Sequence, residues 1–326
     1  MYLDFYGLAE RPFSTAPDPR FLCLTRRHRE ALAQLTYGVQ EDHGFIVLTG
    51  PVGTGKTTLL HALRNLVGPN VAVAFVSSSM LPFKGLLEYI LKELGIGAAP
   101  RSHAQRLIAL DDFLVDRHRA ALKTVLILDE AQNFSPETLE QVRLLSNFNH
   151  QGARLLQIVL AGQPELATTL ALPALRQLGQ RVAFRYGIEP LLPGETREYI
   201  QRRLRIAGAR DDRIFSDRAV STIARYSGGV PRVINLLCDH CLLVGYAEQR
   251  RRIEPDIVEE ARKQLHTGSR RHRVLDVARE SSTTFRRWAV GTLAAVAIVA
   301  GVGMLLTSDP GHFIELARSA RHLFMR

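Results

Sequence analysis

The sequence predicts an α/β protein with a parallel sheet covered by helices on both faces, an all-helical region after it, and one apolar helix near the carboxyl end. Short apolar runs alternate with amphipathic stretches from Phe45 onward, which is the pattern of a parallel sheet wrapped by helices. Strand signals stop at Gly194, and only helical periodicity continues. Residues 288–307 are twenty consecutive uncharged residues, about the length that crosses a bilayer core.

Each strand is predicted from a short apolar run and each helix from the amphipathic stretch that follows it. The expected strands are 45–49, 71–76, 124–128, 155–161 and 182–188, and the expected helices between them are 26–40, 56–67, 82–94, 103–121, 136–147 and 173–178. The all-helical region should contain helices at 195–207, 216–226, 231–247 and 254–265. We therefore expect an α/β domain over residues 1–192 and a helical domain over residues 193–266.

The charge of the chain is unevenly distributed. The formal net charge is +10 and the isoelectric point is near 9.9, which alone fits a nucleic-acid, lipid or arginine-rich surface. Residues 262–287 carry eight Arg and Lys against two acidic residues and directly precede the apolar run. This position favours a basic linker beside a membrane, over 267–287, rather than a DNA-binding surface. Three cysteines exclude a disulfide framework and indicate a reducing compartment.

The strongest chemical signal follows the first predicted strand. Gly50, Gly55, Lys56 and Thr57 complete the pattern G-x-x-x-x-G-K-[ST], with a strand before it and a helix after it, the context that identifies a phosphate-binding loop. Backbone N–H groups and the helix N-terminus bind phosphate oxygens in such a loop. We expect Lys56 to contact the β- and γ-phosphates and the Thr57 hydroxyl to ligate Mg²⁺. The expected nucleotide-binding set is Gly50, Pro51, Val52, Gly53, Thr54, Gly55, Lys56, Thr57 and Thr58.

A pair of carboxylates supplies the second chemical element. The stretch KTVLILDEAQ ends an apolar strand in Asp129 and Glu130. An acidic residue at a strand end beside a phosphate loop holds Mg²⁺ in many nucleotide hydrolases, and its neighbour polarises the attacking water. We therefore assign Asp129 to the metal, together with Thr57, and Glu130 to the water.

With these motifs in place, the chain resembles the AAA+ superfamily and, within it, the secretion-ATPase family of the general secretion pathway protein A type. The resemblance rests on FYGLAERPFSTAPDPRFL, GPVGTGKTT, LILDEAQ, IVLAGQPEL, LRQLGQRV and YSGGVPRVINLL, which occur in the family's order up to about His266. It implies an ATPase that uses ATP and Mg²⁺, with the helical domain acting as a lid.

The resemblance also implies further site residues. Gln163, after the fourth predicted strand, takes the place of a polar residue that orients the attacking water. Arg181 takes the place of an arginine finger offered to a neighbouring subunit, with Arg176 as the alternative. Arg232 resembles a second sensor that touches the γ-phosphate. The aromatic stretches Pro12-Phe13 and Tyr37-Gly38 either flank adenine or pack under the sheet.

The apolar run 288–307 is uncharged on every face and lies beyond a basic linker, so we expect a transmembrane helix rather than a buried core helix. The positive-inside rule places the arginine-rich flank, and with it the ATPase, in the cytoplasm of a bacterial cell, at the inner membrane. Long members of the family continue beyond this span into a periplasmic peptidoglycan-binding region. Here about 19 residues follow Thr307, and we expect a short periplasmic tail over 308–326.

Three hypotheses on function follow. The preferred one is a membrane-tethered, homo-oligomeric AAA+ ATPase that assembles or regulates an envelope secretion, pilus or polysaccharide-export system through envelope assembly proteins. The second is a nucleic-acid-binding ATPase of the transposition-helper type, although nucleic acid is not an expected partner because the basic surplus gathers next to the apolar run. The third is a switch that binds ATP with little turnover, against which the intact Glu130 argues.

Overall fold

The protein is described from a computed structural model. The structure describes residues 2–14, 19–21, 23–41, 44–77, 81–97, 102–211 and 213–265. Among these residues, none of the helices combines the length and apolar character needed to cross a membrane. The predicted linker 267–287, apolar span 288–307 and tail 308–326 lie outside the described residues.

Five parallel strands form the sheet in the order β2-β3-β6-β1-β7. They are β1 (Phe45–Thr49), β2 (Val71–Val76), β3 (Lys123–Leu128), β6 (Gln157–Gly162) and β7 (Val182–Gly187). The register pairs Thr49 with Gly162 and Leu128 with Leu160. The carboxyl ends of β1, β3 and β6 therefore lie at one edge, where α/β sheets bind their ligands. All five predicted strands are confirmed.

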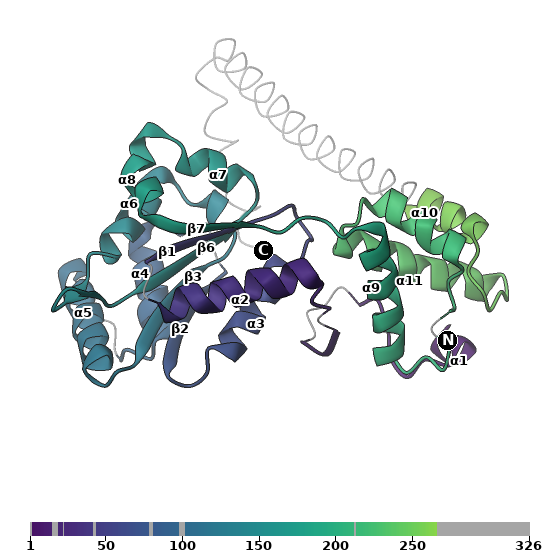
Figure 1. Cartoon of the computed structure of the whole chain (residues 1–326), viewed down its shortest axis with the longest axis horizontal. Helices are drawn as coiled ribbons and strands as arrows, with labels where there is room; N and C mark the ends of the chain where they lie inside the picture. Colours follow the sequence, from purple (N-terminus) through teal and green to yellow (C-terminus); the bar gives the residue numbers. More distant parts are fainter. Residues whose placement is uncertain are drawn as a thin grey trace, which may run out of the picture. The chain divides into compact units, whose positions relative to one another are not determined.

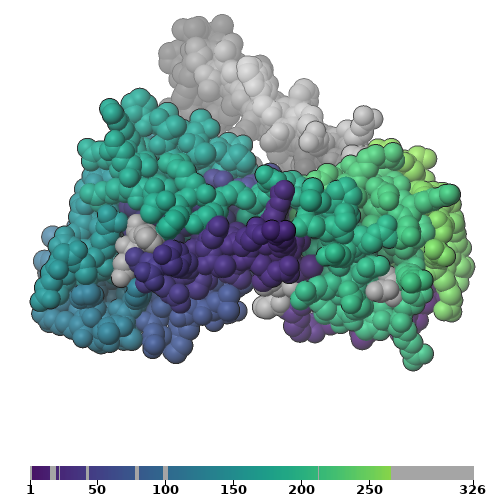
Figure 2. Space-filling view, in the orientation of Figure 1, coloured from purple at the N-terminus to yellow at the C-terminus, as the bar shows by residue number. Residues whose placement is uncertain are grey.

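Helices cover both faces of the sheet (Figure 1). One face packs against α2 (Arg26–Gln40) and α3 (Lys56–Leu66), and the other against α4 (Phe83–Glu93), α5 (His103–Arg119) and α6 (Pro136–Leu145). Alternate residues of β3 enter the two cores: Val125 and Ile127 face α2 and α3, whereas Leu126 and Leu128 face the opposite layer. The outer face of α2 is exposed in the purple band at the centre of Figure 2.

Local chemistry sets the helix ends. Ser102 accepts a hydrogen bond from the backbone N–H of Gln105, whose side chain accepts from the Ser102 N–H, which forms a capping box at the start of α5. Ser135 caps α6 through a single bond, its hydroxyl oxygen accepting from Thr138 N–H. The helix predicted to reach residue 121 ends at Arg119 because Ala121 adopts a positive φ of 56°.

Several short elements were not predicted. They are α1 (Tyr2–Tyr6), α7 (Glu165–Leu170), α8 (Arg176–Arg181) and the antiparallel pair β4 (Asn149–His150) with β5 (Ala153–Arg154). The helix predicted at 173–178 is a 3-10 turn over Pro173–Leu175 followed by α8. Elements of two to six residues are too short to display a hydrophobic period, so pattern reading does not detect them.

The helical region contains α9 (Pro193–Ile206), α10 (Asp217–Ser227), α11 (Pro231–Ala247) and a helix over 255–265. Gly228 ends α10 with a φ of 56°, and Gly229 has a φ of 74°. A Cβ on Gly229 would lie 2.0 Å from the Leu191 carbonyl oxygen, and Gly229 O accepts from Leu191 N–H at 2.8 Å. The glycine pair thus lets the start of α11 pack closely against the segment that leaves β7.

Candidate functional site

The phosphate loop joins β1 to α3 at the ligand-binding edge of the sheet. Gly53 and Gly55 have φ values of 81° and 97°, a conformation that residues with a Cβ rarely adopt. A Cβ on Gly50 would lie 2.7 Å from the Ile188 carbonyl oxygen. The ring of His28 supports the loop from α2, with Nε2 3.1 Å from Thr54 O. The predicted glycine-rich turn is therefore present, with its open side at the N-terminus of α3.

Lys56 is the first residue of α3 and is only 5% exposed. Its ammonium donates to the carbonyl oxygens of Gly50 at 2.7 Å and Pro51 at 3.1 Å. Burial lowers the pKa of Lys56, and the nearby carboxylates of Glu130 and Asp129 act in the opposite direction. Because an ammonium has three protons, one remains for an oxygen of a bound phosphate.

Thr57 and Asp129 meet across the site. The Thr57 hydroxyl donates to Asp129 Oδ2 at 2.6 Å, and Oδ1 of the same carboxylate accepts from Glu130 N–H at 2.9 Å. Asp129 is 2% exposed. Hydroxyl and carboxylate oxygens suit Mg²⁺, which is usually held by one or two carboxylates together with substrate phosphates. The two oxygen donors therefore fit a magnesium ion whose other ligands come from the substrate and water.

Glu130 follows directly and adopts a left-handed conformation, with φ 52° and ψ 38°. A residue with a Cβ pays about 1–2 kcal/mol for this conformation, and such strain persists where the surroundings hold it. The side chain of Gln132 donates to Glu130 Oε2 at 2.7 Å, and the Gln163 side chain lies 3.5 Å from the same oxygen. The structure thus brings the two residues assigned to the attacking water next to each other.

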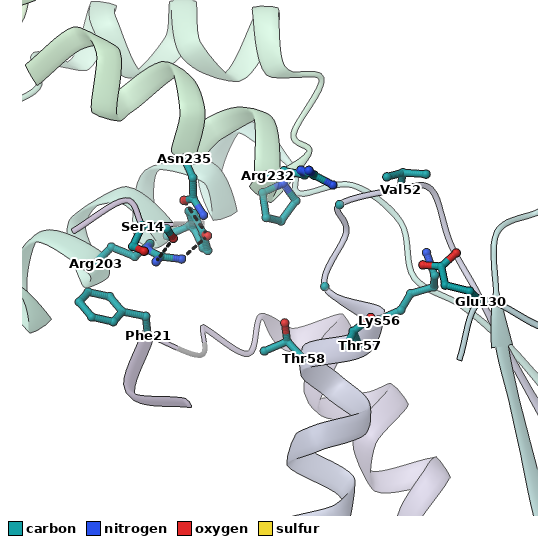
Figure 3. Close-up of a pocket in the computed structure, with 14 residues that line it drawn as sticks. Ser14, Phe21, Val52, Lys56, Thr57, Thr58, Glu130, Arg203, Arg232 and Asn235 are labelled. Carbon is teal, nitrogen blue, oxygen red and sulfur yellow. Dashed lines mark hydrogen bonds between the residues drawn. The ribbon is translucent and has the colours of Figure 1, made fainter. Parts of the chain in front are cut away.

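A pocket of about 450 Å³ opens over the phosphate loop (Figure 3). One wall is the loop with Lys56, Thr57 and Glu130, and Arg232 faces it from the start of α11. Arg232 N–H donates to Gly53 O at 3.3 Å. Sequence reasoning missed the far end of the pocket, which comes from the N-terminal segment, α9 and α11 and comprises Ser14, Phe21, Tyr199, Arg203 and Asn235.

Arg203 organises that far end and is 6% exposed. Its guanidinium donates to the carbonyl oxygens of Pro12 at 2.6 Å and Ser14 at 3.2 Å and to the Tyr199 hydroxyl at 2.8 Å. The guanidinium carbon lies 4.9 Å from the centre of the Phe21 ring. The single local signal was an arginine in an arginine-rich helix, RRLR, which does not distinguish Arg203 from its exposed neighbours.

Other predicted residues lie elsewhere. Arg181, at the end of α8, donates to Ser146 Oγ and Asn147 Oδ1, both at 2.7 Å, whereas Arg176 is exposed at the start of the same helix. Neither arginine lines the pocket of its own chain.

Neither of the two aromatic stretches, Pro12-Phe13 and Tyr37-Gly38, lines the pocket. Phe13 is 1% exposed and packs edge-on against Phe215, just before α10, so it is a buried packing residue but does not lie under the sheet. Tyr37 is 53% exposed and lies against Phe184 of the edge strand β7, away from the pocket.

Comparison with known proteins agrees with this geometry. Residues 39–170 match the family described as AAA domain. The chain is 41% identical over 254 residues to General secretion pathway protein A of Aeromonas hydrophila, a match that covers 78% of this chain and 46% of that protein. The chain therefore spans about half the length of this relative.

Two solved structures share the fold. The ORC2 protein of Aeropyrum pernix gives a TM-score of 0.60 at 20% identity, covering 78% of this chain and 71% of that chain. Cdc6p from Pyrobaculum aerophilum gives 0.61 at 21% identity, covering 78% and 70%. At this identity the likeness concerns the fold alone. Together with the 41% identical relative, the AAA domain match confirms the resemblance inferred from the motifs: the chain contains an AAA domain and is similar over 78% of its length to general secretion pathway protein A.

Proposed function

We propose that the protein hydrolyses ATP with Mg²⁺ and uses the cycle at a bacterial inner membrane. The observation that carries this proposal is the 2.6 Å contact between Thr57 and Asp129 beside the phosphate loop. It joins the hydroxyl and the carboxylate that a magnesium nucleotide requires. The bound metal would neutralise charge on the phosphates.

The residues of the chain take separate roles in this proposal. The loop N–H groups and Lys56 bind the phosphates and stabilise the charge that develops on them. Glu130 accepts a proton from the attacking water, and Gln163 orients that water from the end of β6. Arg232 contacts the phosphates from α11, so the helical region acts as the lid over the nucleotide. The rings of Phe21 and Tyr199, at the far end of the pocket, suit the flat face of a purine.

The membrane and oligomer parts of the proposal rest on sequence and kinship. Residues 288–307 are uncharged and follow the basic linker, so we assign them as a single span with the ATPase on the cytoplasmic side. The relative's name contains general secretion pathway, and we extend it to an envelope secretion, pilus or polysaccharide-export assembly as the client. Arg181 lies outside the pocket of its own chain, which fits a finger offered to a second copy in a homo-oligomer.

The test of catalysis uses the full chain, purified in detergent, with Mg²⁺ and ATP. We expect Lys56→Ala to abolish hydrolysis by removing phosphate contacts, and Glu130→Gln to bind ATP but turn over at least about 10²-fold more slowly. The exposed residues Lys84 and Glu41 provide matched controls, Lys84→Ala and Glu41→Gln, which should leave the rate unchanged. Wild-type turnover by Glu130→Gln would refute the assignment of the base.

The membrane assignment has its own test. A chain truncated after Arg287 should move from the membrane to the soluble fraction, because the truncation removes the apolar run that supplies most of the insertion energy. Retention of the truncated chain on membranes after a high-salt wash would place the tether elsewhere.

A further inference from the structure

The side chain of Gln132 lies between the two residues assigned to the attacking water. Its amide nitrogen is 2.7 Å from Glu130 Oε2, and its amide oxygen is 3.0 Å from the backbone nitrogen of Gln163. One amide therefore joins the loop after β3 to the first residue after β6. Gln132 lies in the 3-10 turn Ala131–Asn133, which starts directly after Glu130. Only one residue therefore separates Gln132 from Glu130 along the chain.

The orientation of this amide is fixed by its partners. A carboxylate only accepts hydrogen bonds, and a backbone N–H only donates. The NH₂ end of Gln132 must therefore face Glu130 and its oxygen must face Gln163, because the reversed amide would place like groups against each other at both ends. A glutamine satisfies the two contacts at once, and neither glutamate nor lysine at this position does.

The surrounding backbone is built to receive this side chain. A Cβ on Gly162 would lie 2.6 Å from Gln132 Oε1, so the amide occupies space that another residue at 162 would fill. Gly162 O in turn accepts a hydrogen bond from Gly50 N–H, the first residue of the phosphate loop, at 3.2 Å. A continuous path therefore runs from the phosphate loop through the end of β6 and Gln132 to the carboxylate of Glu130.

We propose that Gln132 is a positioning residue: it holds the Glu130 carboxylate and the backbone of Gln163 as one unit, and so keeps the Gln163 side chain and Glu130 together beside the attacking water. This inference rests on the proposed hydrolysis of ATP. Gln132 does not line the pocket, so it acts on the reaction through Glu130 rather than through the nucleotide. Its loss should slow the chemical step and leave ATP affinity unchanged, because the phosphate contacts come from other residues.

The variants separate the two contacts of the amide. Gln132→Glu keeps an acceptor for Gln163 N–H but replaces the donor to Glu130 with a repelling charge, and Gln132→Leu removes both contacts at similar volume. We expect kcat to fall by about 10- to 100-fold in both variants, with the Kd for ATP changed by less than about threefold. Gln141→Leu, the same substitution at an exposed glutamine on α6, is the matched control. Gly162→Ala should lower kcat in the wild type by displacing the amide.

A double-mutant cycle in the full chain decides between positioning and a purely structural role. If Gln132 acts through Glu130, Gln132→Leu should add less than about a twofold loss of kcat in the Glu130→Gln background. An equal loss in both backgrounds, a wild-type kcat in Gln132→Leu, or a loss of ATP affinity that matches the loss of kcat would overturn the inference. Wild-type protein that binds ATP without hydrolysing it would instead refute the proposed function, and the inference with it.

Discussion

Replacing Arg203 with alanine tests whether the far end of the pocket is a structural tie as well as a ligand wall. The side chain joins α9 to the N-terminal segment, 191 residues earlier in the chain, through its 2.6 Å contact to Pro12 O. It also contacts Ser14 O and the Tyr199 hydroxyl. The guanidinium lies over the rings of Phe21 and Tyr199, with its carbon 4.9 Å and 5.5 Å from their centres. The alanine variant loses all of these contacts together.

The expected cost follows from these contacts. A hydrogen bond to a charged group contributes about 1.5–3 kcal/mol, and a buried partner left unpaired costs about 1–3 kcal/mol. The three hydrogen bonds of Arg203 share one side chain, so their contributions are not additive. Relief from burying the charge offsets part of the loss. We therefore expect Arg203→Ala to lower the free energy of unfolding by about 3–5 kcal/mol. Arg203→Lys should lose about half as much, because an ammonium cannot reproduce the planar fork.

Urea unfolding of a fragment that ends after residue 265 measures this cost, since residues 1–262 form one compact unit with both sheet cores inside it. Far-ultraviolet circular dichroism follows the helices, and an unchanged slope with urea shows that the two states are comparable. Arg202→Ala, at the exposed neighbouring arginine, should stay within about 0.5 kcal/mol of wild type. A loss below about 1 kcal/mol in Arg203→Ala would refute the reasoning and show that water replaces the guanidinium at these carbonyls.

Three further outcomes are expected. Thr57→Ala should raise the Mg²⁺ concentration for half-maximal hydrolysis at least about tenfold, and Thr57→Ser should not, because only the serine keeps the hydroxyl beside Asp129; equal curves would remove Thr57 from the metal site. Burial raises the pKa of Tyr6 from 10.0 to about 12, so the folded state holds the phenol proton more tightly than the unfolded state. The contribution of the protonated Tyr6 to the stability of the fold is complete below pH 10 and is lost as the pH rises to 12. The free energy of unfolding should fall by about 2–3 kcal/mol over this range, and an identical pH profile in Tyr6→Phe would contradict this cause. Mixing Arg181→Ala with Lys56→Ala subunits should restore hydrolysis that each variant lacks alone, whereas a mixture as inactive as its components would leave Arg181 a structural residue of α8.

The sheet and half of the site could be predicted because their signals are local. The residues that turn the chain at Gly50–Thr57 are adjacent in sequence, and the apolar runs before them and before Asp129 identify two strands of one parallel sheet, β1 and β3, which lie on either side of β6. Strand ends in a parallel sheet meet at one edge, so the contact between Thr57 and Asp129, 72 residues apart, followed from the order of the elements.

The other half of the site depends on contacts that carry no local signal. Arg203 differs from Arg202 only in the face of α9 on which it falls, and its partners at Pro12 and Ser14 come from an irregular segment. Gln132 belongs to the recognised tetrapeptide DEAQ, yet its role depends on the absence of a side chain at Gly162. Such pairings are set by tertiary packing, which neither hydrophobic period nor motif spacing encodes.

The pocket also explains how a nucleotide would act on the whole compact unit. Its walls come from the N-terminal segment, the phosphate loop and the helices α9 and α11, so a ligand that contacts all of them stabilises their joint arrangement. A ligand at about 100 times its Kd adds about 2.7 kcal/mol to the free energy of unfolding, which is comparable with the expected contribution of Arg203. Arg232 N–H donates to Gly53 O, so the helical region already contacts the phosphate loop, and Gly229 packs against Leu191 in the segment after β7. Under the proposal that Arg232 touches the γ-phosphate, loss of that phosphate would change the contacts of Arg232, at the start of α11, and so act on the helical region.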